Sequence, residues 1–201
     1  MKLFYSPGAC SLSPHIVLRE LGLPFELERV DTKAGKTERG ANFLIVNPKG
    51  YVPALQLDDG AVLTEGPAIV QYLADRRPEA KLAPAAGTMD RYRLQEWLNY
   101  ITSEMHKSVG SLFNPRMPPE FRQVTKELVG KRLTYLAENL SARNFLMGDA
   151  FSVADAYLFV VLGWCRYHEI DLAPWPALTD YVARITSRPA VQAALKAEGL
   201  A

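Results

Sequence analysis

The sequence predicts two unlike parts, an α/β segment over residues 1–80 and an all-α segment over residues 88–201. Up to about residue 76, short apolar runs alternate with helical stretches, whereas beyond residue 87 only helical periodicity appears. Residues 77–87 are rich in proline and alanine and contain a glycine, which indicates a linker. At 201 residues, the chain is long enough for one large domain or for two small ones that share an interface.

The first segment is expected to form one mixed sheet covered by helices. Its expected elements are a strand at residues 2–5, a helix at 11–21, a strand at 25–30, a short apolar turn at 43–46, a hairpin at 52–63 and a helix at 64–76. Pro14 fits only the first turn of a helix, so the first helix should begin at residues 11–13, with Cys10 just ahead of it. Thr64 is the expected N-cap of the last helix.

The second segment contains a series of amphipathic stretches. Two apolar stripes run over residues 94–112 and 121–140, and two further helices are expected over residues 176–187 and 189–196. Ser152 and Asp155 stand at the N-cap and N3 positions of another helix. That helix is apolar around most of its circumference, which predicts that it forms the buried centre of the all-α domain.

Composition and charge exclude several function classes. Hydrophobic residues make up 48% and charged residues 22%, which is a globular balance, and the net charge of +1 argues against nucleic acid as a partner. The longest nearly apolar run, residues 156–165, is well short of the roughly 20 residues that span a bilayer, so no membrane partner is expected. The start of the chain has no apolar segment of signal-peptide length, and two cysteines cannot build a disulfide framework. We therefore expect a soluble, cytoplasmic protein.

Cys10 is the sharpest chemical feature. A thiol ahead of a helix N-terminus lies near the positive end of the helix dipole and near unpaired N–H groups, and both favour the thiolate. A lower pKa alone brings little gain in reactivity, because a more acidic thiolate is also a weaker nucleophile. Two interpretations stay open, a reactive thiol and a small buried core thiol, and Cys165 inside an apolar helix fits the second.

Glu65 and Gly66 mark the start of the helix that follows the hairpin. Free N–H groups there favour a bound carboxylate, while the Glu65 side chain suits an ammonium group, so a ligand with an amino-acid head fits both. An acidic residue that merely complements the helix dipole is the alternative. Pro53 precedes a strand, and a cis bond before it would leave the Val52 backbone free to pair with an extended peptide.

The long helix carries a second group of polar residues, with Asn99, Ser103 and His106 on one face. A lone histidine on such a face is commonly just solvated, so this group does not identify a site by itself. The cysteines and histidines contain no compact ligand pair, and we therefore expect no metal site.

Several motifs together resemble bacterial beta-class glutathione transferases. They occur in the same order along essentially the full chain, at residues 5–15, 47–53, 63–73, 96–100, 104–107 and 151–158. The resemblance implies the glutathione transferase architecture, with a thioredoxin-like N-terminal domain that binds glutathione and an all-helical C-terminal domain. It also implies a homodimer, glutathione as co-substrate, and a role in detoxification.

The resemblance implies a set of site residues, two of which, Cys10 and His106, are the expected catalytic residues. Cys10 approaches the sulfur of glutathione, Val52 pairs with its cysteinyl part beside cis-Pro53, and Glu65 with the Gly66 N–H holds its γ-glutamyl end. On the long helix, His106 and Lys107 lie beside the thiol, and Asn99 and Glu104 reach glutathione from the partner subunit.

Three positions depart from the family pattern. Where the family often has a lysine for the glycyl carboxylate, this chain has Gly35, so Lys33 or Lys36 is the expected substitute. Tyr51 stands where glutamine is common and is expected at the rim of the site, and Gly66 offers only its backbone.

The function expected from these observations is transfer of the glutathione thiolate to a small apolar electrophile, bound in a pocket lined partly by the long helix around His106 and Val109. One alternative is a glutathione-dependent thiol–disulfide oxidoreductase that uses Cys10. Another is a non-enzymatic protein that binds apolar ligands.

Overall fold

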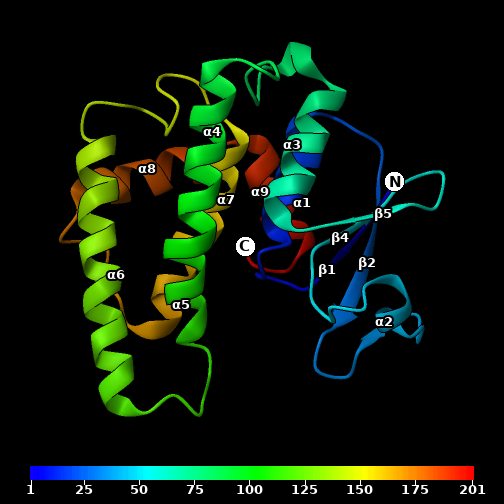
Figure 1. Cartoon of the computed structure of the whole chain (residues 1–201), viewed down its shortest axis with the longest axis horizontal. Coiled ribbons are helices and arrows are strands. Elements are labelled where there is room, and N and C mark those ends of the chain that lie inside the picture. The colour runs from blue at the N-terminus through cyan, green and yellow to red at the C-terminus, as the bar shows by residue number, and fades with distance from the viewer. The chain divides into compact units, whose positions relative to one another are not determined.

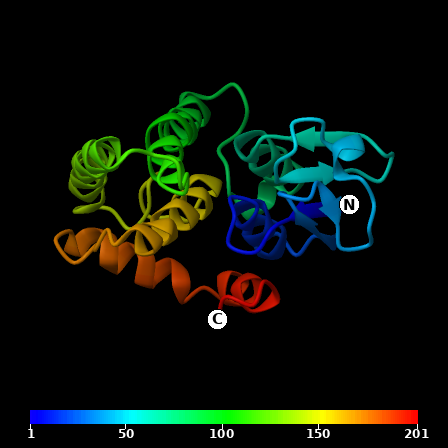
Figure 2. The same cartoon turned by 90° about the horizontal axis from the view of Figure 1, so that it is seen from below.

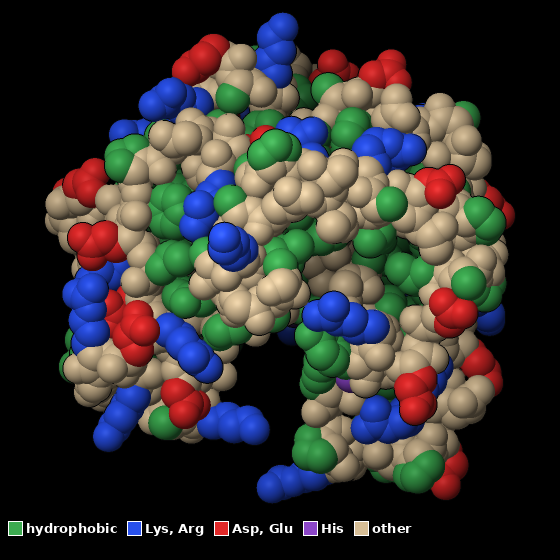
Figure 3. Space-filling view, turned by 180° about the vertical axis from the view of Figure 1, so that it is seen from behind, with side chains coloured by type: hydrophobic (Ala, Val, Ile, Leu, Met, Phe, Trp, Pro, Cys, Tyr) green, Lys and Arg blue, Asp and Glu red, His purple; other side chains and the backbone are tan.

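A computed structural model describes the whole chain, residues 1–201, and divides it into two compact units. The first unit comprises Met1–Ala83 together with Arg188–Ala201, and the second comprises Pro84–Ser187. No helix is both long enough and apolar enough to cross a membrane. On the face shown in Figure 3, basic and acidic side chains are interspersed, which agrees with the net charge of +1.

The first unit contains a five-stranded mixed sheet of order β3-β2-β1-β4-β5. The strands are β1 (Lys2–Tyr5), β2 (Glu26–Asp31), β3 (Lys36–Thr37), β4 (Ala54–Gln56) and β5 (Val62–Thr64). β1 pairs in parallel with β2, with Leu3 opposite Leu27, and antiparallel with β4, with Leu3 opposite Leu55. Parallel pairing of β1 and β2 requires a crossover, which helix α1 provides.

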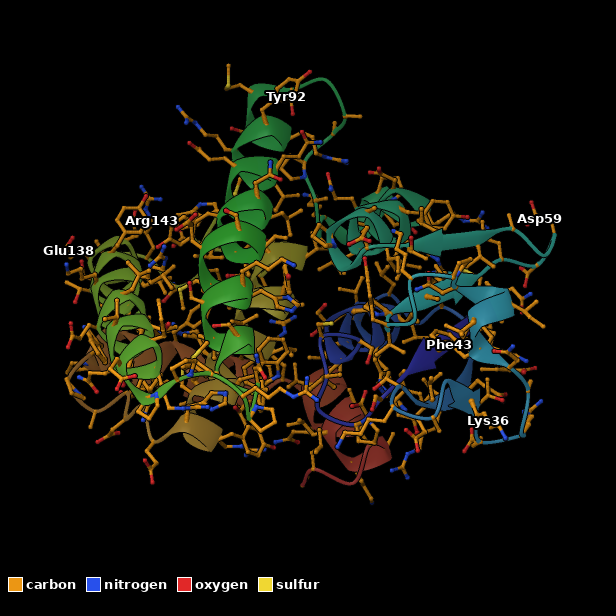
Figure 4. The ribbon with its side chains drawn as sticks, turned by 60° about the horizontal axis from the view of Figure 1, so that its bottom comes forward. Lys36, Phe43, Asp59, Tyr92, Glu138 and Arg143 are labelled. Atoms are coloured by element: carbon orange, nitrogen blue, oxygen red, sulfur yellow. The ribbon has the colours of Figure 1, made fainter.

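Helices cover both faces of this sheet (Figure 1). α1 (Leu12–Glu20) and α3 (Gly66–Arg76) pack against each other on one face, and the short α2 (Phe43–Val46) covers the other. Phe43 is fully buried, and its ring centroid lies 5.6 Å from that of Phe4 on β1. Figure 4 shows Phe43 beneath the ribbon of α2, turned toward the strands. This packing fixes α2 and the loop that follows it on the sheet.

The last helix, α9 (Pro189–Ala197), packs against α1 at the opposite end of the sequence (Figure 2). Behind it, the fully buried side chains of His15 and Glu198 share a hydrogen bond of 2.8 Å, and Arg188 pairs with Glu20 at 2.6 Å. These contacts place residues 188–201 in the first compact unit, whereas the sequence grouped them with the helical segment 88–201. The functional division into residues 1–80 and 88–201 stays a prediction.

The second unit is all-helical. Its helices are α4 (Met89–Tyr100), a π-helical stretch η2 (Ile101–His106), α5 (Lys107–Ser111), α6 (Pro119–Leu140), α7 (Val153–Trp164) and α8 (Pro176–Thr186). α7 is buried along nearly its whole length, and Ser152 and Asp155 form its capping box. Short 3₁₀ turns lie at Pro78–Ala80 in the first unit and at Cys165–His168 after α7.

The predicted fold class is confirmed, an α/β thioredoxin-like unit and an all-α unit. Three local expectations were wrong or incomplete. Thr64 ends β5, and Glu65 is the N-cap of α3. Between the strand expected at residues 25–30 and the apolar turn expected at residues 43–46, the chain forms the two-residue strand β3, which was not among the expected elements. On α6 the face that packs inward is the one carrying Val129 and Leu133, so Phe121, Val124 and Leu128 of the expected stripe remain exposed.

Candidate functional site

Cys10 lies two residues ahead of α1, as predicted, and its side chain is half-buried. Its thiol donates a hydrogen bond to the carbonyl oxygen of Val52, with a sulfur–oxygen distance of 3.2 Å. Burial raises the pKa of the Cys10 thiol to about 11, although the backbone N–H groups of Cys10 and Ser11 act in the opposite direction. The backbone N–H groups thus favour the thiolate as expected, but in the free protein burial has the larger effect and the pKa is raised overall.

The Val52–Pro53 peptide bond is cis, as the resemblance implied, and it leads directly into β4. The start of α3 approaches the same turn, because a Cβ atom on Gly66 would lie 3.9 Å from the Pro53 ring and 4.0 Å from the Ser13 hydroxyl. Cys10, Val52, Pro53 and Gly66 therefore converge at one end of the sheet. All four were predicted site residues, and the fold brings them together.

Glu65 adopts a φ of 69°, which is unusual for a residue with a side chain, and it caps α3 without a side-chain hydrogen bond to that helix. Its Oε1 accepts hydrogen bonds from the Lys49 ammonium at 2.5 Å and from the Tyr51 hydroxyl at 2.8 Å. The hydrogen bond to Glu65 raises the pKa of Lys49 and also that of Tyr51. Backbone strain of this kind is concentrated at functional sites.

Lys49 is a member of this cluster that the sequence analysis did not single out. The buried Asn47 shapes its loop, since the side-chain amide donates to the Tyr51 carbonyl at 2.6 Å and accepts from the Lys49 N–H at 3.2 Å. The signal was present in the motif at residues 47–53, in which Lys49 lies between the asparagine and Tyr51.

Lys33 and Lys36 belong to a different part of the first unit. Both side chains are exposed at the β2–β3 connection, where Asp31 accepts hydrogen bonds from the N–H groups of Lys33 and Ala34. They line a hollow of about 620 Å³, and Figure 4 shows Lys36 at the outer edge of this unit. No hydrogen bond or ion pair joins either lysine to the Lys49–Glu65 pair, so their contact with a ligand stays a prediction.

In the second unit, His106 ends the π-helical stretch and is held by its neighbours. Its Nδ1 shares a hydrogen bond of 2.6 Å with the Tyr157 hydroxyl, and its ring meets that of Trp164 edge-on at 4.7 Å. His106 is thus fixed by α7 and is more than a solvated surface histidine. π-Helical stretches are frequent at functional sites.

The other predicted residues on this helix differ in their surroundings. Glu104 is paired with the guanidinium of Arg132 on α6, which lowers the pKa of the Glu104 carboxyl. Asn99 and Lys107 are exposed. Their contacts with a ligand stay predictions.

Cys165 is buried, and burial raises the pKa of its thiol to about 11. This environment agrees with the interpretation of Cys165 as a core residue. No group of three His, Cys, Asp or Glu side chains gathers where a metal ion would bind.

An aromatic hollow of about 670 Å³ lies between α4 and α6. The ring centroids of Trp97, Tyr100 and Tyr135 lie 5.3 to 6.2 Å apart along it. Figure 4 shows Tyr92 near the start of α4 and labels Arg143 just beyond the end of α6. Partly exposed aromatic surface of this kind is typical of a protein–protein contact.

Two family models match the chain. The model described as the glutathione S-transferase N-terminal domain matches residues 8–76, and the one described as the glutathione S-transferase C-terminal domain matches residues 100–189. Together they cover every predicted site residue except Asn99.

Curated and solved relatives agree with these matches. The chain is 46% identical over 200 residues to the glutathione S-transferase GstA of Escherichia coli O157:H7, with all of both chains covered. Among solved structures, BphK, described as a bacterial GST, shares 58% identity with a TM-score of 0.98, and all of both chains is covered. A sphingomonad glutathione S-transferase complexed with glutathione shares 54% identity with a TM-score of 0.97, again over all of both chains.

Proposed function

The chain belongs to the glutathione S-transferase family, and we propose that its first unit binds glutathione at the cluster formed by Cys10, Val52, Pro53, Glu65 and Gly66. It is a transferase by family, and the proposal concerns which residues perform each task. The single observation that supports it most is the Cys10 thiol, poised against the Val52 carbonyl beside the cis-proline turn.

Binding uses three features of the first unit. The backbone of Val52 pairs with the cysteinyl part of the tripeptide. The Glu65 carboxylate holds the ammonium group of the γ-glutamyl end, and the N–H of Gly66 holds the adjacent carboxylate. A sphingomonad relative with glutathione bound supports glutathione as the co-substrate.

The neutral Cys10 thiol acts as a hydrogen-bond donor. With a pKa of about 11, Cys10 is almost entirely protonated at pH 7. When glutathione occupies the Val52 carbonyl, its thiol releases its proton to solvent water. The Cys10 S–H then turns from that carbonyl oxygen to the glutathione sulfur and stabilises the thiolate. The thiolate sulfur then forms a bond to the electrophilic carbon of a small apolar compound, whose leaving group departs with the electron pair of the broken bond.

The same raised pKa argues against the alternative in which Cys10 itself performs disulfide exchange, since exchange requires its thiolate. Replacing Cys10 separates these roles. Cys10→Ser keeps a donor and should retain conjugation within about threefold, whereas Cys10→Ala removes the donor and should lower kcat/KM about tenfold, the effect of one hydrogen bond to a charged group. If both variants conjugate at the wild-type rate and only disulfide reduction is lost, Cys10 belongs to redox chemistry instead.

The experiment that tests the proposal measures glutathione binding by calorimetry and the ionisation of the bound thiol by its ultraviolet absorbance. We expect the pKa of the bound thiol to fall below its value in free glutathione, and to return toward that value in Cys10→Ala. An unshifted pKa, together with no conjugation of any electrophile tried, would count against conjugation and favour the non-enzymatic binding alternative.

We also propose that the chain forms a homodimer through the aromatic surface of α4 and α6. The exposed Met89, Tyr92 and Tyr135 on these helices support this proposal, because such apolar surface is usually covered in assemblies. In analytical ultracentrifugation, the wild type should sediment as a dimer and Tyr135→Glu should dissociate at higher protein concentrations. A wild type that sediments as a monomer, or a variant that dimerises as strongly as the wild type, would overturn the proposal.

The implied role is detoxification of electrophiles in the cytoplasm. Both cysteines are free thiols, which supports a reducing compartment.

A further inference from the structure

The Glu65 carboxylate is already occupied by a cation of the chain itself. Lys49 places its ammonium 2.5 Å from Glu65 Oε1 and 2.9 Å from the Thr64 hydroxyl, and 5.9 Å from the centre of the Tyr51 ring. A carboxylate, a hydroxyl and an aromatic face are the partners that a primary ammonium of a ligand would seek. Lys49 therefore sits where such a group would bind.

Glu65 is directed to this contact by its backbone. At a φ of 69° the residue is the N-cap of α3 without a side-chain capping hydrogen bond, and its carboxylate contacts Lys49 and Tyr51 of the loop at residues 47–51. Asn47 fixes that loop by bonding to the backbone on both sides of Gly50. Strand, loop and helix thus hold Lys49 and Glu65 face to face.

From this arrangement we infer that Lys49 is an internal competitor for the ligand's amino group, so that glutathione must displace the Lys49 ammonium from Glu65 in order to bind. This inference rests on the proposed function, in which Glu65 holds the γ-glutamyl ammonium. Lys49 and Glu65 are 45% and 52% exposed, so their ion pair is weak and opens readily. The displaced ammonium stays on the loop at the rim of the site, where it faces a ligand that carries two carboxylates.

Competition predicts a specific pattern of affinities. The ligands are glutathione and glutaryl-cysteinyl-glycine, an analogue that lacks only the amino group. The quantity of interest is the dissociation constant of the analogue divided by that of glutathione. In Lys49→Met this ratio should rise about two- to fivefold over the wild type, because a surface ion pair of this strength no longer opposes the ammonium. A general loss of positive charge does not cancel in the ratio, because the analogue has two carboxylates and no ammonium, whereas glutathione has two carboxylates and one ammonium. Variants that match or keep the charge must therefore measure this contribution.

Two variants serve as controls. Lys49→Arg keeps a cation for Glu65 and should keep the wild-type ratio. Lys196→Met removes an exposed lysine on α9 with the same change in net charge, and it should leave the ratio unchanged. Calorimetry of the full-length protein at one fixed ionic strength measures all four dissociation constants needed for each comparison.

The outcomes separate this inference from the proposed function. If Lys49→Met, in which the competing ammonium is absent, binds both ligands equally, or neither, Glu65 does not hold the ammonium and the proposed site fails. If the wild type prefers glutathione but Lys49→Met leaves the ratio unchanged, the competition is absent and only the role of Lys49 is overturned. A fall of the ratio in Lys49→Met would show that Lys49 assists the ammonium instead, and it would overturn the inference equally.

Discussion

Helices α7 and α3 each have an acidic residue at or near the N-terminus, but the two carboxylates have different kinds of hydrogen-bond partner. At α7, Asp155 turns back on its own helix: its carboxylate accepts hydrogen bonds from the N–H groups of Leu146 and Ser152 and from the hydroxyls of Ser152 and Tyr181. At α3, the side chain of the N-cap residue Glu65 makes no capping hydrogen bond and instead contacts Lys49 and Tyr51 at the surface. A carboxylate thus stabilises the fold at α7, whereas at α3 a carboxylate lies at the surface where a ligand can reach it.

Burial explains the difference. Asp155 is fully buried, and burial raises the pKa of its carboxyl even though four donors surround it, so any lost donor exposes the full cost of desolvation. Glu65 is about half exposed, and water replaces any partner that leaves. A site that exchanges partners needs the second kind of environment, whereas a folding element needs the first.

The largest expected effect follows from breaking the α7 cap. Asp155→Ala leaves the Tyr181 hydroxyl and the Leu146 N–H buried without an acceptor, so the free energy of unfolding should fall by at least about 3 kcal/mol. Urea denaturation measures the loss, with Glu65→Ala as the contrasting variant, expected to change stability by less than about 1 kcal/mol. Equal losses in the two variants would contradict the comparison.

A second prediction concerns the ligand and the backbone at Glu65. Glu65→Gly and Glu65→Ala both remove the carboxylate, so each should weaken glutathione binding about tenfold, the lower end for a charge-assisted hydrogen bond at a half-exposed site. The two variants should differ in stability, with the glycine variant more stable by about 1 kcal/mol because glycine tolerates positive φ.

Calorimetry and thermal unfolding test both parts. Wild-type affinity in either variant would remove Glu65 from the site. An alanine variant as stable as the glycine variant would show that the backbone at this position is not strained.

The smallest effect concerns the pH dependence of Cys10 in the free protein. Only the thiolate reacts with an alkylating reagent, so the rate should rise about tenfold per pH unit up to about pH 11 instead of levelling near the ordinary value of 9. Mass spectrometry of the alkylated protein gives the rate, and Cys10→Ala supplies the background from the buried Cys165. A plateau below pH 8 would show that the helix dipole dominates after all.

The sequence predicted the elements whose signals are local. The strand at residues 2–5 and the capping box of Ser152 and Asp155 were placed correctly, because a short apolar run closed by turn residues and N-cap chemistry both act over a few residues. β3 has only two residues and leaves no periodic signal. On α6, Phe121 and Val124 are exposed although they continue an apolar stripe, because neighbouring helices decide which face is covered.

The candidate site was predicted in the same uneven way. Local sequence patterns singled out Cys10, Pro53 and Glu65, the motif resemblance gave them roles, and the fold brings them to one end of the sheet. Lys49 escaped notice because its importance lies in a contact with a residue sixteen positions away, which no local pattern records.

By itself, the sequence determined the order of elements, the family and the identity of the chemical groups, since these depend on side-chain types and on periodicities within a few residues. Only the tertiary structure decided the protonation of Cys10 and the partner of Glu65. Both depend on how much water reaches a group and on which distant backbone or side chain is packed beside it. Desolvation and through-space contacts are properties of the folded chain, and here they reverse the thiolate expected from the helix dipole alone.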